Sequence, residues 1–387
     1  MSAIQQELNA FFKTLQGQDY SLHTVTKGAL TQARAKLKWE AFGELTQAGV
    51  KAFYEGAPYR VWKGHRLLGV DGSSLNLPSH PSVQEEFGAY QVGCQNTVTR
   101  SMARLSLCYD VLNCLTLDAQ LSSFSTAEQK LLDKHLQAVQ FRSGDVLLLD
   151  RNYPSISLLY RLSKMGLHFC LRMRVGWWKQ VRLFMQEDCQ SKEVVFALPK
   201  KQQHLRAQFG AQTDTVRCRL VKVVLDSGET EVLCTSLLDE QRYRIEDLGE
   251  LYHFRWRVEE AYKLLKCRVG LEVFSGKTAL SVRQDVAAKV FMMSMCALFS
   301  FPIEEKLRDE SKASGRKHAR QVNRTSAFAF CKDGWIALWL KQKSSTFFTA
   351  LDRLLEKTTD IIRANRKFER KHNRKSPPPM NYKQAAP

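Results

Sequence analysis

The sequence predicts an α/β fold, in which strands and helices alternate around a buried sheet. Val146–Leu149 is an apolar run without polar alternation, which is typical of a strand buried on both faces. Pro154 follows, and proline at a first helical position predicts that a helix begins there. Upstream, residues 65–123 contain three strand-like stretches, and Ser125–Glu128 has the pattern of a capping box that opens a helix. Three strands, a helix, a strand and a helix are therefore expected in this order.

Two of the predicted strands lead directly into an aspartate. Asp71 follows Leu67–Val70, and Asp150 follows Val146–Leu149. Acids at the carboxyl ends of buried strands lie where α/β sheets place their chemistry. Two structural alternatives stay open, because Asp-Gly between apolar stretches is also a strong hairpin signal and Asp150 could simply cap the next helix.

A third acid, Glu259, belongs to a predicted helix over Leu251–Lys266. Five side chains follow one another there at intervals of three or four residues: Tyr252, Arg255, Glu259, Lys263 and Lys266. This spacing places them in one stripe. A solvated face supported by the Glu259–Lys263 pair is the structural alternative. A carboxylate among basic and tyrosine side chains suits a metal ion and a polyphosphate, which points toward cutting or joining nucleic acid.

Three carboxylates from separate elements can hold two Mg²⁺ ions about 3.5–4 Å apart, one to activate the attacking oxygen and one to stabilise the departing oxygen. Oxygen ligands are what such hard cations prefer. We therefore predict that Asp71, Asp150 and Glu259 are both the catalytic residues and the metal ligands.

These three windows resemble those of DDE transposases of the insertion-sequence-4 type. That family carries Tyr, two residues, Arg, three residues, Glu, six residues and Lys on the helix of its third acid. Four residues match this pattern in full: Tyr252, Arg255, Glu259 and Lys266. The Asp-Gly-Ser at Asp71 and the Asp-Arg-x-Tyr at Asp150 also resemble the family's aspartate motifs. Asn152 departs from the pattern, because the family usually has glycine or another small residue there.

The resemblance implies a ribonuclease-H-like catalytic core interrupted by a β-rich insertion, with helical N- and C-terminal regions. The segments that we expect are a helical N-terminal region over 1–60, which is a candidate DNA-binding unit, the first part of the core over 61–173, the β-rich insertion over 174–240, the core with the Glu259 helix over 241–310 and a basic helical C-terminal region over 311–387. It also implies Mg²⁺, with Mn²⁺ as a substitute, and DNA cleavage and strand transfer at the inverted-repeat ends of an insertion sequence. Double-stranded DNA and a second copy in a synaptic homodimer are the implied partners.

Further side chains are candidates for contact with DNA. We expect Tyr252, Arg255, Lys263, Lys266 and Arg151 to lie along the phosphates. Trp177 and Trp178 stand among basic residues, a combination that suits base stacking, worth about 1–3 kcal/mol per base. A tryptophan pair that seals the base of the insertion is the alternative.

The composition favours a polyanionic partner, since 58 Lys+Arg against 39 Asp+Glu give a net charge of +19. It does not separate DNA from RNA, or binding from catalysis. The cysteines lack Cys-x-x-Cys pairs and so do not predict a zinc site. The longest apolar stretch, Val290–Phe301, is too short to span a bilayer and is expected in a buried helix. We expect a cytoplasmic, nucleoid-associated protein without a membrane partner.

Two other functions compete with the transposase interpretation. The first is a ribonuclease-H-like nuclease that hydrolyses DNA without strand transfer. The second is a domesticated, catalytically silent DNA-binding protein. The intact set of acids argues against the second, because DNA binding alone does not need three metal-binding carboxylates.

Overall fold

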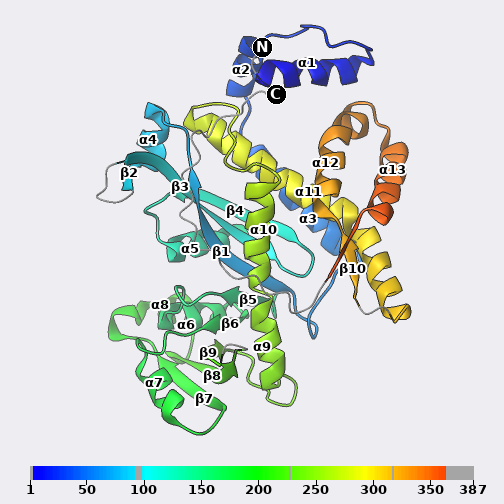
Figure 1. Ribbon diagram of the computed structural model, residues 1–387. Coiled ribbons are helices and arrows are strands. Elements are labelled where there is room, and N and C mark those ends of the chain that lie inside the picture. Colours follow the sequence, from blue (N-terminus) through cyan, green and yellow to red (C-terminus); the bar gives the residue numbers. More distant parts are fainter. Residues whose placement is uncertain (1–2, 93–97, 226–227, 316–317, 363–387) are drawn as a thin grey trace. The chain divides into compact units, whose positions relative to one another are not determined.

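The computed structural model describes residues 3–92, 98–225, 228–315 and 318–362 (Figure 1). The chain divides into two compact units: unit 1 is Met1–Gly56, Ser74–Ala103 and Lys263–Pro387, and unit 2 is Ala57–Ser73 and Arg104–Tyr262. Strands β1 (Leu67–Asn76) and β3 (Val98–Asp110) and helix α10 (Trp256–Cys267) each include residues of both units. The boundaries of the two units differ in kind from those of the five segments expected from the sequence. The five segments therefore remain a prediction.

A mixed sheet forms the centre of unit 2. Its strands lie in the order β3-β1-β5-β6-β9-β8-β7, and β4 also pairs with β3. Their bounds are β4 Leu115–Ser123, β5 Val146–Leu149, β6 His168–Arg172, β7 Ser191–Ala197, β8 Thr215–Val224 and β9 Thr230–Thr235. Strand β5 is parallel to both β1 and β6, whereas β9, β8 and β7 continue the sheet in antiparallel pairs. The predicted α/β class is confirmed.

The middle of this sheet is buried as its apolar sequence requires. All four residues of β5 are fully buried, which confirms the expectation of a strand covered on both faces. Before β1 and β5, Arg66 and Asp145 form a buried two-pronged ion pair, with Nε–Oδ1 at 2.8 Å and Nη2–Oδ2 at 2.5 Å. This pair ties the beginnings of the two parallel strands together.

Two helix starts in unit 2 differ from the prediction. Helix α6 (Ile156–Lys164) begins after Ser155, whose hydroxyl accepts from the amide of Leu158, so Pro154 precedes the cap instead of opening the helix. Helix α5 (Glu128–Ala138) has Ala127 at its N-cap and no side-chain cap. The predicted capping box is wrong because the Ser125 hydroxyl pairs with that of Ser123.

The segment predicted as a β-rich insertion contributes strands to the same sheet. It contains β7, β8 and β9, with the short helices α7 (Lys179–Gln186) and α8 (His204–Gln208). Strand β9 pairs with β6 through Leu171 and Cys234, so the inserted strands extend the sheet of the preceding segment. Strands β8 and β9 pair antiparallel up to Val224 and Thr230, and residues 226 and 227 between them lie outside the described residues. Helix α9 (Ile245–His253) then leads toward α10.

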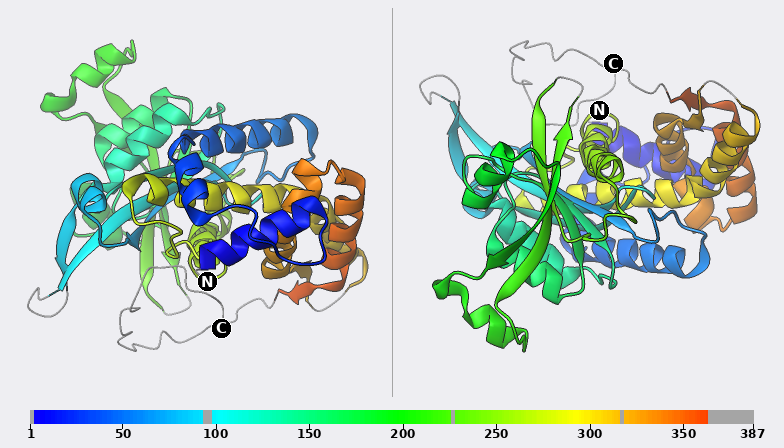
Figure 2. Two further views of the ribbon diagram at one scale, coloured as in Figure 1. Left: turned by 90° about the horizontal axis from the view of Figure 1, so that it is seen from above. Right: turned by 90° about the horizontal axis from the view of Figure 1, so that it is seen from below.

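The described residues of unit 1 are mostly helical, and residues 363–387 of the expected C-terminal region lie outside the described residues. The helices of unit 1 are α1 Ala3–Gln16, α2 Lys27–Ala35, α3 Glu40–Gly56, α4 Pro81–Phe87, α11 Ala279–Ala313, α12 Arg324–Trp335 and α13 Ser344–Lys357. The short strand β2 (Ala89–Val92) pairs with the first part of β3, and β10 (Arg320–Val322) pairs with β11 (Thr359–Ile361). Helix α11 packs against α3, α12 and α13 (Figure 2).

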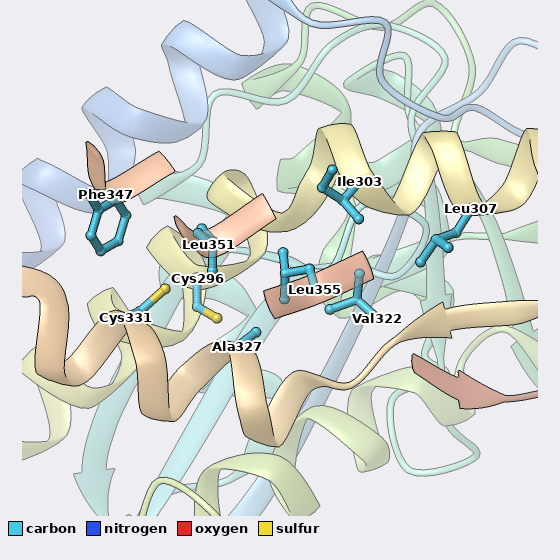
Figure 3. Close-up of a cluster of buried hydrophobic side chains, with 9 residues drawn as sticks. All are labelled: Cys296, Ile303, Leu307, Val322, Ala327, Cys331, Phe347, Leu351 and Leu355. Carbon is cyan, nitrogen blue, oxygen red and sulfur yellow. The ribbon is translucent and has the colours of Figure 1, made fainter. Parts of the chain in front are cut away.

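One cluster of buried side chains joins the last three helices of unit 1 (Figure 3). It consists of Cys296, Ile303 and Leu307 of α11, Val322 of β10, Ala327 and Cys331 of α12, and Phe347, Leu351 and Leu355 of α13. Val290 and Phe301 are also buried, so the apolar stretch between them belongs to a buried helix, as predicted. By length and composition alone, α11 could cross a membrane, but 56% of its apolar window is buried inside the protein.

Candidate active site

The pairing of β1 with β5 places two of the predicted acids side by side. Leu68 pairs with Leu147 and Gly69 with Leu148. Continuing this parallel register by two residues puts Asp71 opposite Asp150, the residue that directly follows β5, and neighbouring strands lie about 4.8 Å apart. Both side chains then face the same side of the sheet. Asp71 lies inside β1, which continues to Asn76, so it neither ends its strand as predicted nor begins a hairpin.

A glycine lets the helix of the third acid approach this strand. A Cβ atom added to Gly69 would collide with Val258 Cγ2 and lie 3.1 Å from Val111 Cγ1. Val258 is fully buried and directly precedes Glu259 on α10. The missing side chain of Gly69 therefore permits the close contact between β1 and α10 that brings Glu259 toward Asp71.

We expect Gly69→Ala to lower the free energy of unfolding by about 1–3 kcal/mol, the usual cost of overpacking a core. Gly43→Ala is the matched control, because Gly43 lies exposed in α3 and an added Cβ meets nothing within 4 Å. That control should be stabilising by up to about 1 kcal/mol. Urea unfolding followed by tryptophan fluorescence measures both, and an unchanged midpoint for Gly69→Ala would contradict the close contact.

The single helix predicted over Leu251–Lys266 is two helices. Helix α9 ends at His253 and α10 begins at Trp256. Between them the amide of Arg255 donates to the Tyr252 carbonyl at 3.1 Å, three residues back instead of four. Such tightened turns within a helical stretch often mark functional sites. Tyr252 therefore lies on a different helix from Glu259, although the three-residue spacing to Arg255 is kept.

Arg255 connects the first and third acids. Its Nη2 lies 3.1 Å from Glu259 Oε1, and its Nη1 lies 3.7 Å from Asp71 Oδ2. The side chain is buried, and its Nε has no hydrogen-bond partner among the described residues. The guanidinium also lies over the ring of Tyr252, 5.7 Å from its centroid. A buried cation thus holds Asp71 and Glu259 together.

Asn152 holds the second acid in place. Its backbone amide donates to Asp150 Oδ1 at 2.7 Å, and its side-chain amide donates to Oδ2 at 3.2 Å. Arg174 donates to the side-chain oxygen of Asn152. The asparagine that departs from the family pattern therefore fixes the orientation of the Asp150 carboxylate.

The electrostatics single out Asp71. Burial raises its pKa from 3.8 to about 6, against the opposing effects of the Gly72 amide and Arg255; Asp150 and Glu128 raise it further. Sequence reasoning missed Glu128, because its pattern resembles an ordinary first-turn helix acid. Tyr153 is the tyrosine of the Asp-Arg-x-Tyr motif, but sequence reasoning assigned it no role of its own. Its side chain is fully buried, and its hydroxyl has no hydrogen-bond partner in the described part of the chain.

The raised pKa of Asp71 predicts a pH-dependent cost to stability. A carboxyl whose pKa is higher in the folded state binds its proton more tightly there, so ionisation destabilises the fold as pH rises from about 4 to 6. A pKa of about 6 in place of 3.8 corresponds to roughly 3 kcal/mol. Asp71→Asn should therefore stabilise the protein by up to that amount at pH 8 in EDTA, and by little at pH 4. If Asp71→Asn shifted the urea midpoint by the same amount at pH 8 and at pH 4, the raised pKa of Asp71 would be contradicted.

The remaining DNA-contact candidates fall into two groups. In unit 2, Arg151 is exposed and Trp177 is 75% exposed, with the Arg174 guanidinium 4.2 Å from its ring centroid. Trp178 instead packs edge-to-face on Phe196 at 5.2 Å, which is the structural alternative for that residue. Tyr252 is buried, so it can affect bound DNA mainly by supporting Arg255, whose guanidinium lies over its ring.

Lys263 and Lys266 lie on the part of α10 that belongs to unit 1. Helical spacing places them one and two turns beyond Glu259. Lys266 Nζ donates to the Ser74 carbonyl at 2.6 Å, and burial lowers the pKa of its ammonium group. Lys266 therefore already has a backbone partner within its own unit.

The donor set at this site suits a hard cation. Asp71, Asp150 and Glu259 offer only carboxylate oxygens, and the buried Tyr153 hydroxyl adds an unpartnered polar atom. Within the described ranges, however, no three His, Cys, Asp or Glu side chains stand close enough together to hold a metal ion. Joint coordination therefore needs side-chain rotation, including release of Glu259 from Arg255.

Known proteins share this region of the chain. Residues 62–296 match the family described as "Transposase DDE domain". The transposase InsG for insertion sequence element IS4 of Escherichia coli K12 is 24% identical over 245 residues, which cover 62% of this chain and 53% of that protein. The chain thus spans about half the length of this relative. The cryo-EM structure of a piggyBac transposase synaptic complex with hairpin DNA is similar with a TM-score of 0.43 and 9% identity, over 75% of this chain and 57% of that one.

Proposed function

Because this chain belongs to the transposase DDE domain family, we propose that it cleaves DNA and transfers strands at the inverted-repeat ends of an insertion sequence. The family membership confirms the resemblance that the sequence motifs indicate, and the similarity to the IS4 transposase supports the insertion-sequence-4 type. One observation carries the proposal. The β1–β5 register sets Asp71 beside Asp150, and Arg255 joins Glu259 to Asp71.

The order of elements supports a ribonuclease-H-like core. Strands β4, β3, β1, β5 and β6 are neighbours in that order, α5 lies in the chain between β4 and β5, and α6 lies between β5 and β6. Three strands, a helix, a strand and a helix is the order that such a core needs. In this proposal, β7, β8 and β9 are the insertion that extends the core sheet.

Asp71, Asp150 and Glu259 are the side chains that would hold divalent cations, Mg²⁺ or Mn²⁺ in its place. When bound, such ions supply positive charge to the attacking and departing oxygens of a phosphodiester. Release of Glu259 would leave the Arg255 guanidinium with donors directed toward a phosphate, whose charge it can neutralise by paired hydrogen bonds. Asn152 keeps the Asp150 carboxylate oriented throughout.

Double-stranded DNA is the proposed partner, with the protein acting as a homodimer in a synaptic complex. Exposed Trp177, stacked on Arg174, offers an aromatic face to an unpaired base, and Arg174 also contacts the loop of Asp150 through Asn152. The net charge of +19 favours association with the phosphate backbone. A cytoplasmic, nucleoid-associated location belongs to the same proposal.

Strand transfer from a pre-cut end tests this function. A duplex that carries the inverted repeat of the element, with its 3′-hydroxyl already exposed, is incubated with the protein, Mg²⁺ and a supercoiled target plasmid. Covalent joining of the labelled end to the plasmid is the expected result. Hydrolysis of uncut DNA without joining would favour the nuclease interpretation, and binding without either reaction would favour the silent DNA-binding protein.

A further inference from the structure

A fourth acid, Glu128, lies against the strand that carries Asp71. It belongs to the first turn of α5. A Cβ atom added to Gly72 would lie 3.2 Å from Glu128 Oε1 and 3.4 Å from its Cγ. The carboxylate therefore rests on the backbone of the residue next to Asp71, in the space that the absent side chain of Gly72 leaves.

The same acid is fixed to the loop of Asp150. The side chain of Asn152, which donates to Asp150, also hydrogen-bonds Glu128. Gln129, the next residue on α5, donates to the carbonyls of Asn152 at 3.3 Å and Tyr153 at 3.2 Å. Glu128 and Asp150 thus share one amide, and the beginning of α5 is tied to the loop that follows β5.

These contacts bring like charges together at a cost. Burial raises the pKa of Glu128 and Asp150 raises it further, while Arg104 lowers it. The contacts with Gly72 and with the loop of Asp150 hold these carboxylates in one region, where a bound cation would offset their repulsion.

An unpartnered hydroxyl lies among the same acids. Tyr153 is fully buried, and within the described ranges its hydroxyl has no hydrogen-bond partner. Its backbone amide donates to the Asp150 carbonyl at 3.3 Å, and its carbonyl accepts from Gln129 at 3.2 Å, so Tyr153 lies between the loop of Asp150 and the beginning of α5. An unsatisfied buried hydroxyl destabilises a fold, and a ligand that accepts its hydrogen bond would offset this cost.

We propose that Glu128 supplies a fourth carboxylate to the divalent-cation site formed by Asp71, Asp150 and Glu259. The Tyr153 hydroxyl would donate to an oxygen atom of a ligand bound beside the cation. This inference rests on the proposed function, because it assumes that the other three acids bind such a cation. Glu128 is half-buried and attached through rotatable bonds, so its carboxylate can turn toward the cation. Nothing in the sequence motif assigns it this role.

Titration of the full chain with Mn²⁺, without DNA, tests the proposal by following free Mn²⁺ in the electron paramagnetic resonance spectrum. Glu128→Gln should raise the Kd for Mn²⁺ about ten- to a hundredfold. Asp133→Asn is the matched control on the same helix, since Asp133 is 44% exposed and pairs with Arg161. Its Kd should equal that of the wild type. Gly72→Ala crowds Glu128 but keeps every carboxylate, and it should also weaken Mn²⁺ binding. This variant tests the role of Glu128 if Glu128→Gln does not fold.

Asp150→Asn separates failure of this inference from failure of the proposed function. Weaker Mn²⁺ binding in both Asp150→Asn and Glu128→Gln supports the four-acid site. Normal binding in Glu128→Gln, with weak binding in Asp150→Asn, overturns the role of Glu128 and leaves the proposed function standing. Normal binding in both variants overturns the cation site as a whole.

Discussion

Glu259→Gln should lower the rate of DNA end cleavage by at least about 10²–10³-fold, the scale of losing one preorganised charged group in an active site. The substitution keeps the size of the side chain but removes the charge that pairs with Arg255 at 3.1 Å. DNA binding should persist, because the substitution removes no lysine or arginine and raises the net charge from +19 by one. Asp150→Asn should have the same effect for the same reason. Single-turnover nicking of a labelled end measures the rate.

Glu260→Gln is the matched control for that experiment. Glu260 is the next residue on α10, and it is exposed, whereas Glu259 is half-buried beside Arg255. Its cleavage rate should stay within a few-fold of the wild-type rate, since surface charges of this kind contribute little. Equal losses in the two variants would show that the helix tolerates no substitution, and would remove the specific role of Glu259.

Arg66→Ala should lower the free energy of unfolding by about 3–5 kcal/mol, because it leaves the buried Asp145 carboxylate with the Arg142 amide but without its positively charged partner. The exposed fractions of the two side chains are only 5% and 3%. Lys51→Ala is the control, since the Lys51–Glu55 pair is 3.9 Å long and largely exposed. Its cost should stay below about 1 kcal/mol. Urea unfolding measures both variants, and similar midpoints would contradict the account.

The same pair bears on activity. Arg66 precedes β1 and Asp145 precedes β5, so their bond sets the register that puts Asp71 beside Asp150. The double variant Arg66→Met with Asp145→Leu should recover most of the lost stability, because apolar residues of similar volume often replace a buried ion pair without net cost. Recovery of stability without recovery of cleavage would show that the ion pair also aligns the acids.

Parts of this fold could be predicted because the pattern of apolar and polar residues in a short segment indicates how that segment is buried. Val146–Leu149 lacks polar alternation, which only a strand covered on both faces explains, and Asp150 then had to lie at its end. The three-residue spacing of Tyr252 and Arg255 is likewise kept across the break between α9 and α10, since a tightened turn keeps neighbouring side chains near one another.

Other features depend on partners that are distant in the sequence. In the sequence, Gly69 is one residue of an apolar strand. Only the packing of Val258 of α10 against it explains why a side chain cannot fit there. Glu128 has the pattern of an ordinary helix start, and only its contact with Gly72 brings it to the acids. The capping box failed for a local reason, because Ser125 had a competing partner in Ser123. Pairing across the sheet and competition among side chains are not visible in one-dimensional patterns.

The central claim is that Asp71, Asp150 and Glu259 converge on one divalent-cation site in the complex with DNA. Replacing Mg²⁺ by Fe²⁺ with ascorbate and peroxide generates hydroxyl radicals at the bound ion, and these cut the protein chain nearby. We predict cuts close to residues 71, 150 and 259, which excess Mg²⁺ suppresses and Asp150→Asn abolishes. Cuts confined to other parts of the chain, or a pattern unchanged in Asp150→Asn, would contradict the claim.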